Sequence, residues 1–174
     1  MNSRELRAMQ LPLKKKYLKD PHAAMYTLHA QGRLDQDRLS VRIQTGLGRV
    51  AAGLHPATGG DGTLACSGDM LLEALAACAG VTLVAVATAM GIEIRQGTVH
   101  VEGDLDFRGT LGVDREAPVG LTAIRLNFDL DCDADADQMA TLLRLTERYC
   151  VVHQTLSHPP SLSMNFERRE SRAT

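Results

Sequence analysis

The residues best able to do chemistry in this sequence are four cysteines, at positions 66, 78, 132 and 150. Their spacing fits neither a disulfide scaffold nor the paired C-x-x-C pattern of a zinc site. Thiols in a reducing compartment either pack as small apolar groups or act as nucleophiles. Cys78 lies in an apolar run, which is typical of a packing cysteine. Cys150 begins a helical turn that contains His153, a place that favours a lowered thiol pKa.

The helices that would position these cysteines follow from the hydrophobic pattern. An uncharged run over 74–90 predicts an apolar helix with Ser67 as its N-cap and Gly91 just past its end. This run approaches the length of a membrane span, but its small residues favour a core helix, and we expect no membrane insertion. A second helix is predicted over 135–149, opened by a capping box, and a short helical turn over 150–156.

Alternating apolar and polar residues predict strands on both sides of the apolar helix. They cover 26–31, 39–44 and 49–54 before it, 99–107 and 124–132 after it, and 162–167 near the end. The order β-β-β-α-β-β-α-β predicts an α+β protein with antiparallel sheets around a long apolar central helix. One sheet covers only one side of that helix, so the pattern also predicts a homodimer. Residues 1–22 are predicted to form an N-terminal helical arm, and 23–174 a single domain.

Charge and composition argue against several other classes of protein. The 19 basic and 21 acidic residues give a net charge of −2 and no basic face repeats, so we expect no nucleic-acid partner. The cluster Lys14-Lys15-Lys16 is typical of a solvated helix face. The polar N-terminal segment predicts no secretory leader and hence a cytoplasmic protein. The Gly-rich stretch over 59–62 lacks the spacing of a phosphate loop, and we expect neither a cofactor nor a metal.

Two longer motifs surround two of the cysteines. The first is SGDMLLEALAAC over 67–78, an acid followed by Leu-Leu and small residues up to Cys78. The second is YCVVHQTL over 149–156, which contains Cys150 and is followed by Pro159-Pro160. Together with the strand order, they resemble the OsmC/Ohr family of thiol-dependent peroxidases over about residues 24–168. The resemblance implies an OsmC-like fold and an intertwined homodimer.

The resemblance also implies a two-cysteine catalytic cycle in oxidative-stress defence. The Cys78 thiolate attacks the O–O bond of a hydroperoxide and becomes a sulfenic acid, and Cys150 condenses with it to form a disulfide. An external dithiol then regenerates both thiols by exchange. Organic hydroperoxides are the favoured substrates because the residues around Cys78 are apolar.

A thiol in an apolar helix needs help to ionise, because desolvation raises its pKa. The resemblance implies that an arginine from the N-terminal strands supplies this help. Arg33 follows the first predicted strand and is the favoured candidate, while Arg42 and Arg49 are also within reach by sequence.

The resemblance further implies a carboxylate that holds the arginine. Asp69 stands where the family usually has Glu, and it is one methylene shorter. At about 100° per residue, Asp69 and Cys78 lie on opposite faces of their helix, so Asp69 would act from the helix start or in the other subunit's site. Glu73, a lone carboxylate in the apolar run, is the alternative.

Two other functions are consistent with the same residues. The first is an OsmC-fold binding protein without peroxidase activity, which the Asp69 substitution and the choice among three arginines leave open. The second is a small metal module in which Cys150 and His153 are joined by Cys66 or Cys78. Cys66 is also an alternative resolving thiol, whereas Cys132 continues the apolar face of its strand and is predicted to lie in the core.

Overall fold

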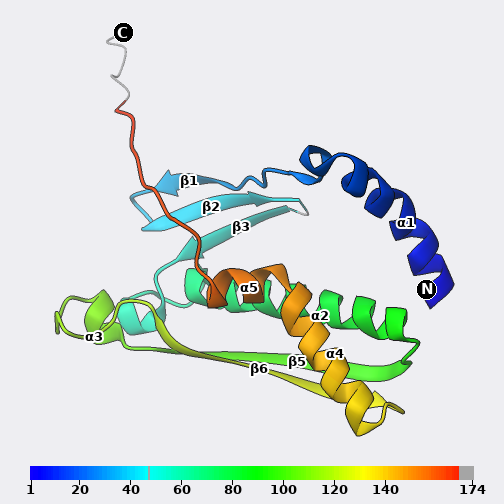
Figure 1. Cartoon of the computed structure of the whole chain (residues 1–174). Coiled ribbons are helices and arrows are strands. Elements are labelled where there is room, and N and C mark those ends of the chain that lie inside the picture. Colours follow the sequence, from blue (N-terminus) through cyan, green and yellow to red (C-terminus); the bar gives the residue numbers. More distant parts are fainter. Residues whose placement is uncertain (47, 169–174) are drawn as a thin grey trace.

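Two sheets lie on opposite sides of one long helix in the computed structural model, which describes residues 1–46 and 48–168 (Figure 1). The N-terminal sheet has the order β1-β2-β3-β4, with β1, β2 and β3 antiparallel and β4 parallel to β3. Strands β5 and β6 form a separate antiparallel pair. The elements in chain order are α1 (Ser3–Lys19), η1 (Pro21–Ala24), β1 (Gln31–Asp35), β2 (Ser40–Thr45), β3 (Gly48–Gly53), η2 (Pro56–Thr58), β4 (Ala65–Cys66), α2 (Ser67–Met90), β5 (Ile94–Leu105), α3 (Phe107–Thr110), β6 (Leu121–Cys132), α4 (Ala136–Tyr149) and α5 (Val151–Ser157).

Helix α2 is the apolar helix that the sequence predicts. It ends at Gly91, whose φ of 75° is the left-handed conformation that glycine adopts without strain. Its start differs from the prediction, because Cys66 is the N-cap, Ser67 is the first helical residue, and no side chain caps the helix. Asp69 lies in the first turn as predicted, where a negative charge suits the helix dipole.

Only one stripe of α2 is buried within the chain. Its members recur every four residues and are at most 2% exposed: Leu75, Ala79, Leu83 and Ala87. The stripe packs on α4, α5 and the inner face of β5–β6. In contrast, the Val81 and Val84 side chains are 73% and 56% exposed. Within the described residues, α2 is the one helix that is long and apolar enough to cross a membrane.

Strands β5 and β6 put apolar residues on one face and ion pairs on the other. Val101, Leu126 and Phe128 pack on the α2 stripe, as the alternation predicts. On the outer face, Arg125 binds Glu102 at 3.1 Å and also Asp104. These pairs are exposed, so each contributes little to stability.

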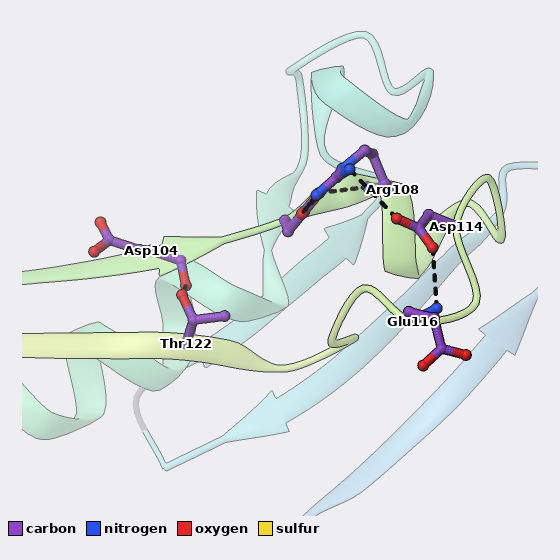
Figure 2. A network of polar contacts seen from close by, with 6 residues as sticks. Asp104, Arg108, Asp114, Glu116 and Thr122 are labelled. Carbon is purple, nitrogen blue, oxygen red and sulfur yellow. Dashed lines mark hydrogen bonds and ion pairs between the residues drawn. The ribbon is translucent and has the colours of Figure 1, made fainter.

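The connection between β5 and β6 is held by local polar contacts (Figure 2). The Arg108 guanidinium binds the carboxylates of Asp106 at 2.6 Å and Asp114 at 3.3 Å. Gly109 permits the tight turn, because a Cβ there would lie 2.5 Å from the Pro118 carbonyl oxygen. This segment begins with α3 at Phe107, where the sequence predicted the end of a strand.

Two of the predicted strands need correction, and one observed strand was not predicted. The first lies at Gln31–Asp35 instead of 26–31, and Tyr26 and Leu28 are 71% and 89% exposed. The last is absent from the described residues: 158–168 contain no strand, and their apolar side chains are at least 92% exposed, namely Leu162, Met164 and Phe166. In residues 26–30 and 162–167, alternation occurs without a neighbouring strand among the described residues. The short strand β4 was not predicted.

Candidate active site

Cys78 and Cys150 come together beneath the junction of α4 and α5. Cys78 lies midway along α2 and is partly buried. Cys150 is 1% exposed and forms a buried cluster with Leu75 and Ala79, against which Cys78 packs. The two thiols are close enough for each to influence the pKa of the other. The structure thus pairs the two cysteines that the motifs indicate.

The backbone at Cys150 explains how its side chain is held. Cys150 ends α4 and starts α5, with extended φ and ψ of −74° and 109°. Its N–H donates to the Thr146 carbonyl oxygen at 2.9 Å, and its Sγ accepts from the His153 N–H at 3.5 Å. This break between two helices turns the first N–H groups of α5 toward α2.

Those N–H groups act on Cys78. Burial raises the pKa of the Cys78 thiol, but hydrogen bonding from the backbone N–H groups of Val152 and Val151 and from the Cys150 thiol stabilises the thiolate. The net effect is a pKa of Cys78 below its ordinary value. Cys78 is therefore the better nucleophile of the pair.

The predicted lowering of the Cys150 pKa is wrong. Burial raises the pKa of Cys150, and the adjacent Cys78 raises it further by favouring the protonated thiol as a donor. The hydrogen bond from the His153 N–H opposes these effects without overcoming them. The helix start that was expected to activate Cys150 instead directs its N–H groups at Cys78.

The three candidate arginines lie together on the N-terminal sheet. Arg33 pairs in register with Arg42, and Arg49 with Gln44, so the three arginines share one face and line one surface cavity. Arg42 binds Asp35 at 2.9 Å, and the Arg49 Nε donates to Gln44 at 3.4 Å. Within the described residues no arginine is among the groups that shift the pKa of Cys78. A role for Arg33 stays a prediction.

The two candidate carboxylates lie on the face of α2 that is turned away from Cys78. Asp69 and Glu73 line a surface cavity shared with His100 and Glu102 of β5. This placement agrees with the helix geometry, which sets Asp69 opposite Cys78. Whether Asp69 or Glu73 acts on an arginine stays a prediction.

The remaining cysteines lie apart from the pair. Cys66 is partly buried at the start of α2, and the Cys132 thiol contacts the Met139 sulfur at 3.7 Å. In residues 1–46 and 48–168, no group of three or more His, Cys, Asp and Glu side chains could hold a metal ion.

Sequence reasoning missed two features of the site. One is the pair of N–H donors from Val151 and Val152, whose signal is a helix start directly after Cys150. The other is a cavity whose lining includes Cys150 and Thr146.

The fold and the paired thiols define an α+β protein whose candidate redox site lies between a central helix and a helix break. The family model described as OsmC-like protein matches residues 60–165, more than half of the chain. The chain belongs to this family of OsmC-like proteins. No curated protein matches it.

Solved structures with the same fold come from several bacteria. An OsmC-like protein from Mycoplasma pneumoniae is 20% identical, with a TM-score of 0.63 over 77% of this chain and 89% of its own. An organic hydroperoxide resistance protein from Legionella pneumophila is 16% identical, with a TM-score of 0.60 over 77% and 91%. Another from Elizabethkingia anophelis is 14% identical, with a TM-score of 0.61 over 78% and 91%. These similarities establish the fold.

Proposed function

We propose that this protein is a thiol-dependent hydroperoxide reductase with Cys78 as the peroxidatic and Cys150 as the resolving cysteine. The observation that supports the proposal most directly is that Cys78 packs against Cys150 while the pKa values of the two thiols are shifted in opposite directions. Cys78 has a lowered pKa and Cys150 a raised one, so one is ready to attack while the other stays a protonated thiol. A two-cysteine cycle requires one thiolate that attacks the peroxide and a second thiol close enough to condense with the sulfenic acid.

Each step of the cycle balances within this pair and its substrates. The Cys78 thiolate attacks the terminal oxygen of ROOH, the O–O bond breaks, and the leaving alkoxide takes a proton to become ROH. Cys78 is then a sulfenic acid. The Cys150 sulfur attacks the Cys78 sulfur, water leaves, and a disulfide forms. An external dithiol reduces this disulfide and leaves as its own disulfide.

Organic hydroperoxides are the proposed substrate class. The groups around Cys78 that carry this choice are apolar: Leu75, Ala79, Val152 and Leu156. Two proteins with the same fold are named as organic hydroperoxide resistance proteins, which supports the same class here. A cytoplasmic location in oxidative-stress defence is part of the proposal, since both cysteines must return to the thiol state in each cycle.

A homodimer is part of the same proposal. Val81 and Val84 leave a wide apolar face of α2 uncovered in the single chain, and such a face favours burial against a second copy. Charge complementarity points the same way. The arginine face of the N-terminal sheet is positive, whereas the cavity beside Asp69 and Glu73 is negative. In such a dimer, Arg33 of one subunit would serve the site of the other, with Asp69 holding it.

The test is a mass map of the protein after a substoichiometric dose of cumene hydroperoxide without reductant. The expected result is a disulfide between the tryptic peptides that contain Cys78 and Cys150. A matched sample treated with hydrogen peroxide measures the preference for organic substrates. If both thiols stay free while the peroxide persists, the protein is an OsmC-fold binding protein without peroxidase activity.

A further inference from the structure

Helix α1 carries a charge opposite to that of the rest of the chain. Its six basic residues and one acidic residue give it a net charge of +5. Because the whole chain has a net charge of −2, the rest of the chain carries −7. The helix also lies before residue 60, where the match to the family model begins, so the family similarity assigns it no role. Figure 1 shows α1 at the edge of the molecule.

One side of α1 is held against the body of the protein. The residues of α1 that are not exposed are Ser3, Leu6, Gln10 and Tyr17, which fall within about 60° of one another around the helix axis. Leu6 is 7% exposed, and the Ser3 hydroxyl donates to the Ala89 carbonyl oxygen at 3.4 Å. The helix is therefore fixed at the end of α2, and the rest of its surface is turned to solvent.

Another side of α1 combines cations with exposed leucines. Leu11 and Leu18 are 46% and 83% exposed. Lys14 and Lys15 each lie three or four residues from both leucines, so the four side chains are neighbours on the helix surface. At about 100° per residue, six exposed residues share a sector about 100° wide, which we call the basic–leucine face. Its members are Arg4, Arg7, Leu11, Lys14, Lys15 and Leu18.

We infer that the basic–leucine face of α1 binds the surface of a membrane that contains anionic lipids. Its four cations complement the negative headgroups, and each strengthens binding about fivefold. Its two leucines enter the boundary between headgroups and acyl chains. The remaining chain, at −7, is repelled by the same surface, so the charge distribution orients the protein with α1 toward the lipid. The inference uses neither Cys78 nor Cys150 and is independent of the proposed peroxidase activity.

The leucines decide between a membrane and the other settings for a basic helix. The cluster Lys14-Lys15-Lys16 alone is typical of a solvated helix face, which gains nothing from a leucine that is 83% exposed. A nucleic acid attracts the cations through its phosphates and leaves Leu11 and Leu18 in water. At a bilayer, in contrast, leucine side chains lose contact with water while lysine stems extend their ammonium groups to the headgroups.

The first experiment measures cosedimentation of the full-length protein with vesicles. We expect binding to vesicles of equal parts phosphatidylglycerol and phosphatidylcholine, little binding to phosphatidylcholine alone, and weakening by salt. Lys14→Gln with Lys15→Gln should weaken binding about twentyfold, because two cations are lost and glutamine preserves the helix. Arg115→Gln with Arg144→Gln is the matched control: both arginines are exposed, and the change in net charge is equal. Equal weakening in the two double variants, or equal binding to both kinds of vesicle, would overturn the inference.

The second experiment follows the leucines. The chain contains no tryptophan, so Leu18→Trp introduces a single fluorophore. Its emission should shift to the blue on phosphatidylglycerol vesicles and be quenched by brominated acyl chains. Leu18→Gln should weaken vesicle binding about fivefold, whereas Leu111→Gln, at a leucine 55% exposed in the β5–β6 connection, should not.

Three results of the second experiment would contradict a membrane-binding role for α1. The first is emission from the Leu18→Trp protein that stays at its value in water. The second is double-stranded DNA binding tighter than vesicle binding and lost with Lys14→Gln and Lys15→Gln, which would assign the face to nucleic acid. The third is a lower mass of Leu18→Gln in light scattering with vesicle binding unchanged, which would assign the face to a second copy of the chain.

Discussion

The two sheets of this molecule differ in how fully a single chain covers them. The inner face of β5–β6 is packed against α2, α4 and α5, and this layer contains both cysteines and the N–H groups that act on Cys78. The N-terminal sheet contains the three arginines, but β1 is exposed along most of its length, and Leu34 is 82% exposed. Cys78 and the groups that lower its pKa are thus built into one layer, while the sheet that contains the candidate arginines is left exposed.

This contrast separates two ways of lowering a thiol pKa. Hydrogen bonds from backbone N–H groups are fixed by the fold and are short-ranged, so they persist in the isolated chain. A guanidinium acts through charge and must be brought close, which a second subunit would do in the proposed dimer. Substitutions that remove one contribution at a time distinguish the two.

The largest effect concerns the two thiols in the layer formed by α2, α4, α5 and the β5–β6 pair, which we call the packed layer. Cys78→Ser should abolish peroxide turnover, because no sulfenic acid can form. Cys150→Ser should consume one peroxide per site and then stop, leaving a sulfenic acid at Cys78 that dimedone traps. Peroxide consumption and intact mass check both outcomes, with Cys132→Ser as the matched control. Full turnover in both variants would show that the contact between Cys78 and Cys150 has no catalytic role.

The next effect concerns the exposed apolar face of α2. Light scattering should give about twice the 18.8 kDa chain mass. Val81→Lys places a charge on the uncovered face and should shift the protein to the monomer. Because Val81 is 73% exposed in the single chain, the same change should alter monomer stability by only about 0.5 kcal/mol.

Val113→Lys is the matched control for this surface, since Val113 is equally exposed but lies in the β5–β6 connection. It should leave the mass unchanged. A wild-type protein that is monomeric in solution, or that dissolves only with detergent, would contradict the dimer, and the second result would assign the exposed face of α2 to a membrane.

The sequence predicts the packed layer better than it predicts the exposed N-terminal sheet. Helix α2, strands β5 and β6 and helix α4 carry a strong periodicity and pack on one another, so local pattern and tertiary contacts agree. The segments over 26–30 and 162–167 alternate just as clearly, yet among the described residues no strand pairs with them. Alternation indicates that a segment can form part of a sheet. It does not indicate which chain supplies the neighbouring strand.

The candidate site shows the same limit. The motifs identify Cys78 and Cys150, because a residue type and its neighbours can be read locally. The direction of their pKa changes depends on how the start of α5 meets the middle of α2, which is a contact between segments far apart in sequence. For that reason Cys150 was expected to be the more acidic thiol, while the structure lowers the pKa of Cys78.

A third experiment removes one N–H donor from the packed layer. Val151 is the first residue of α5, where proline is tolerated, and Cys150 before it already has the extended backbone that proline requires. Val151→Pro should therefore keep the helix while raising the pKa of Cys78 by about one pKa unit, the value of one hydrogen bond to a charged group.

The measurement for Val151→Pro is the pH dependence of Cys78 alkylation by iodoacetamide. Because the pKa of Cys78 is lowered, wild-type alkylation should remain fast below the ordinary thiol pKa and decline only as pH falls through the lowered value. The proline variant should lose reactivity at a higher pH. Val151→Ala retains the N–H and should titrate like the wild type, so an equal displacement in both variants would contradict the hydrogen-bond explanation.

The smallest expected effect belongs to the open sheet. Arg33 is the candidate cation because its guanidinium has no ion pair or hydrogen bond among the described residues, whereas Arg42 is held by Asp35 and Arg49 by Gln44. Arg33→Ala should raise the pKa of Cys78 by less than Val151→Pro does, because solvent and salt screen an exposed charge. The displacement should shrink at high ionic strength and vanish in the monomeric Val81→Lys background, where no second subunit supplies the arginine. Arg49→Ala, on the same face of the sheet, is the matched control. If Arg33→Ala instead raises the pKa of Cys78 more than Val151→Pro does, the N–H groups of α5 are secondary and the open sheet, not the packed layer, controls the nucleophile.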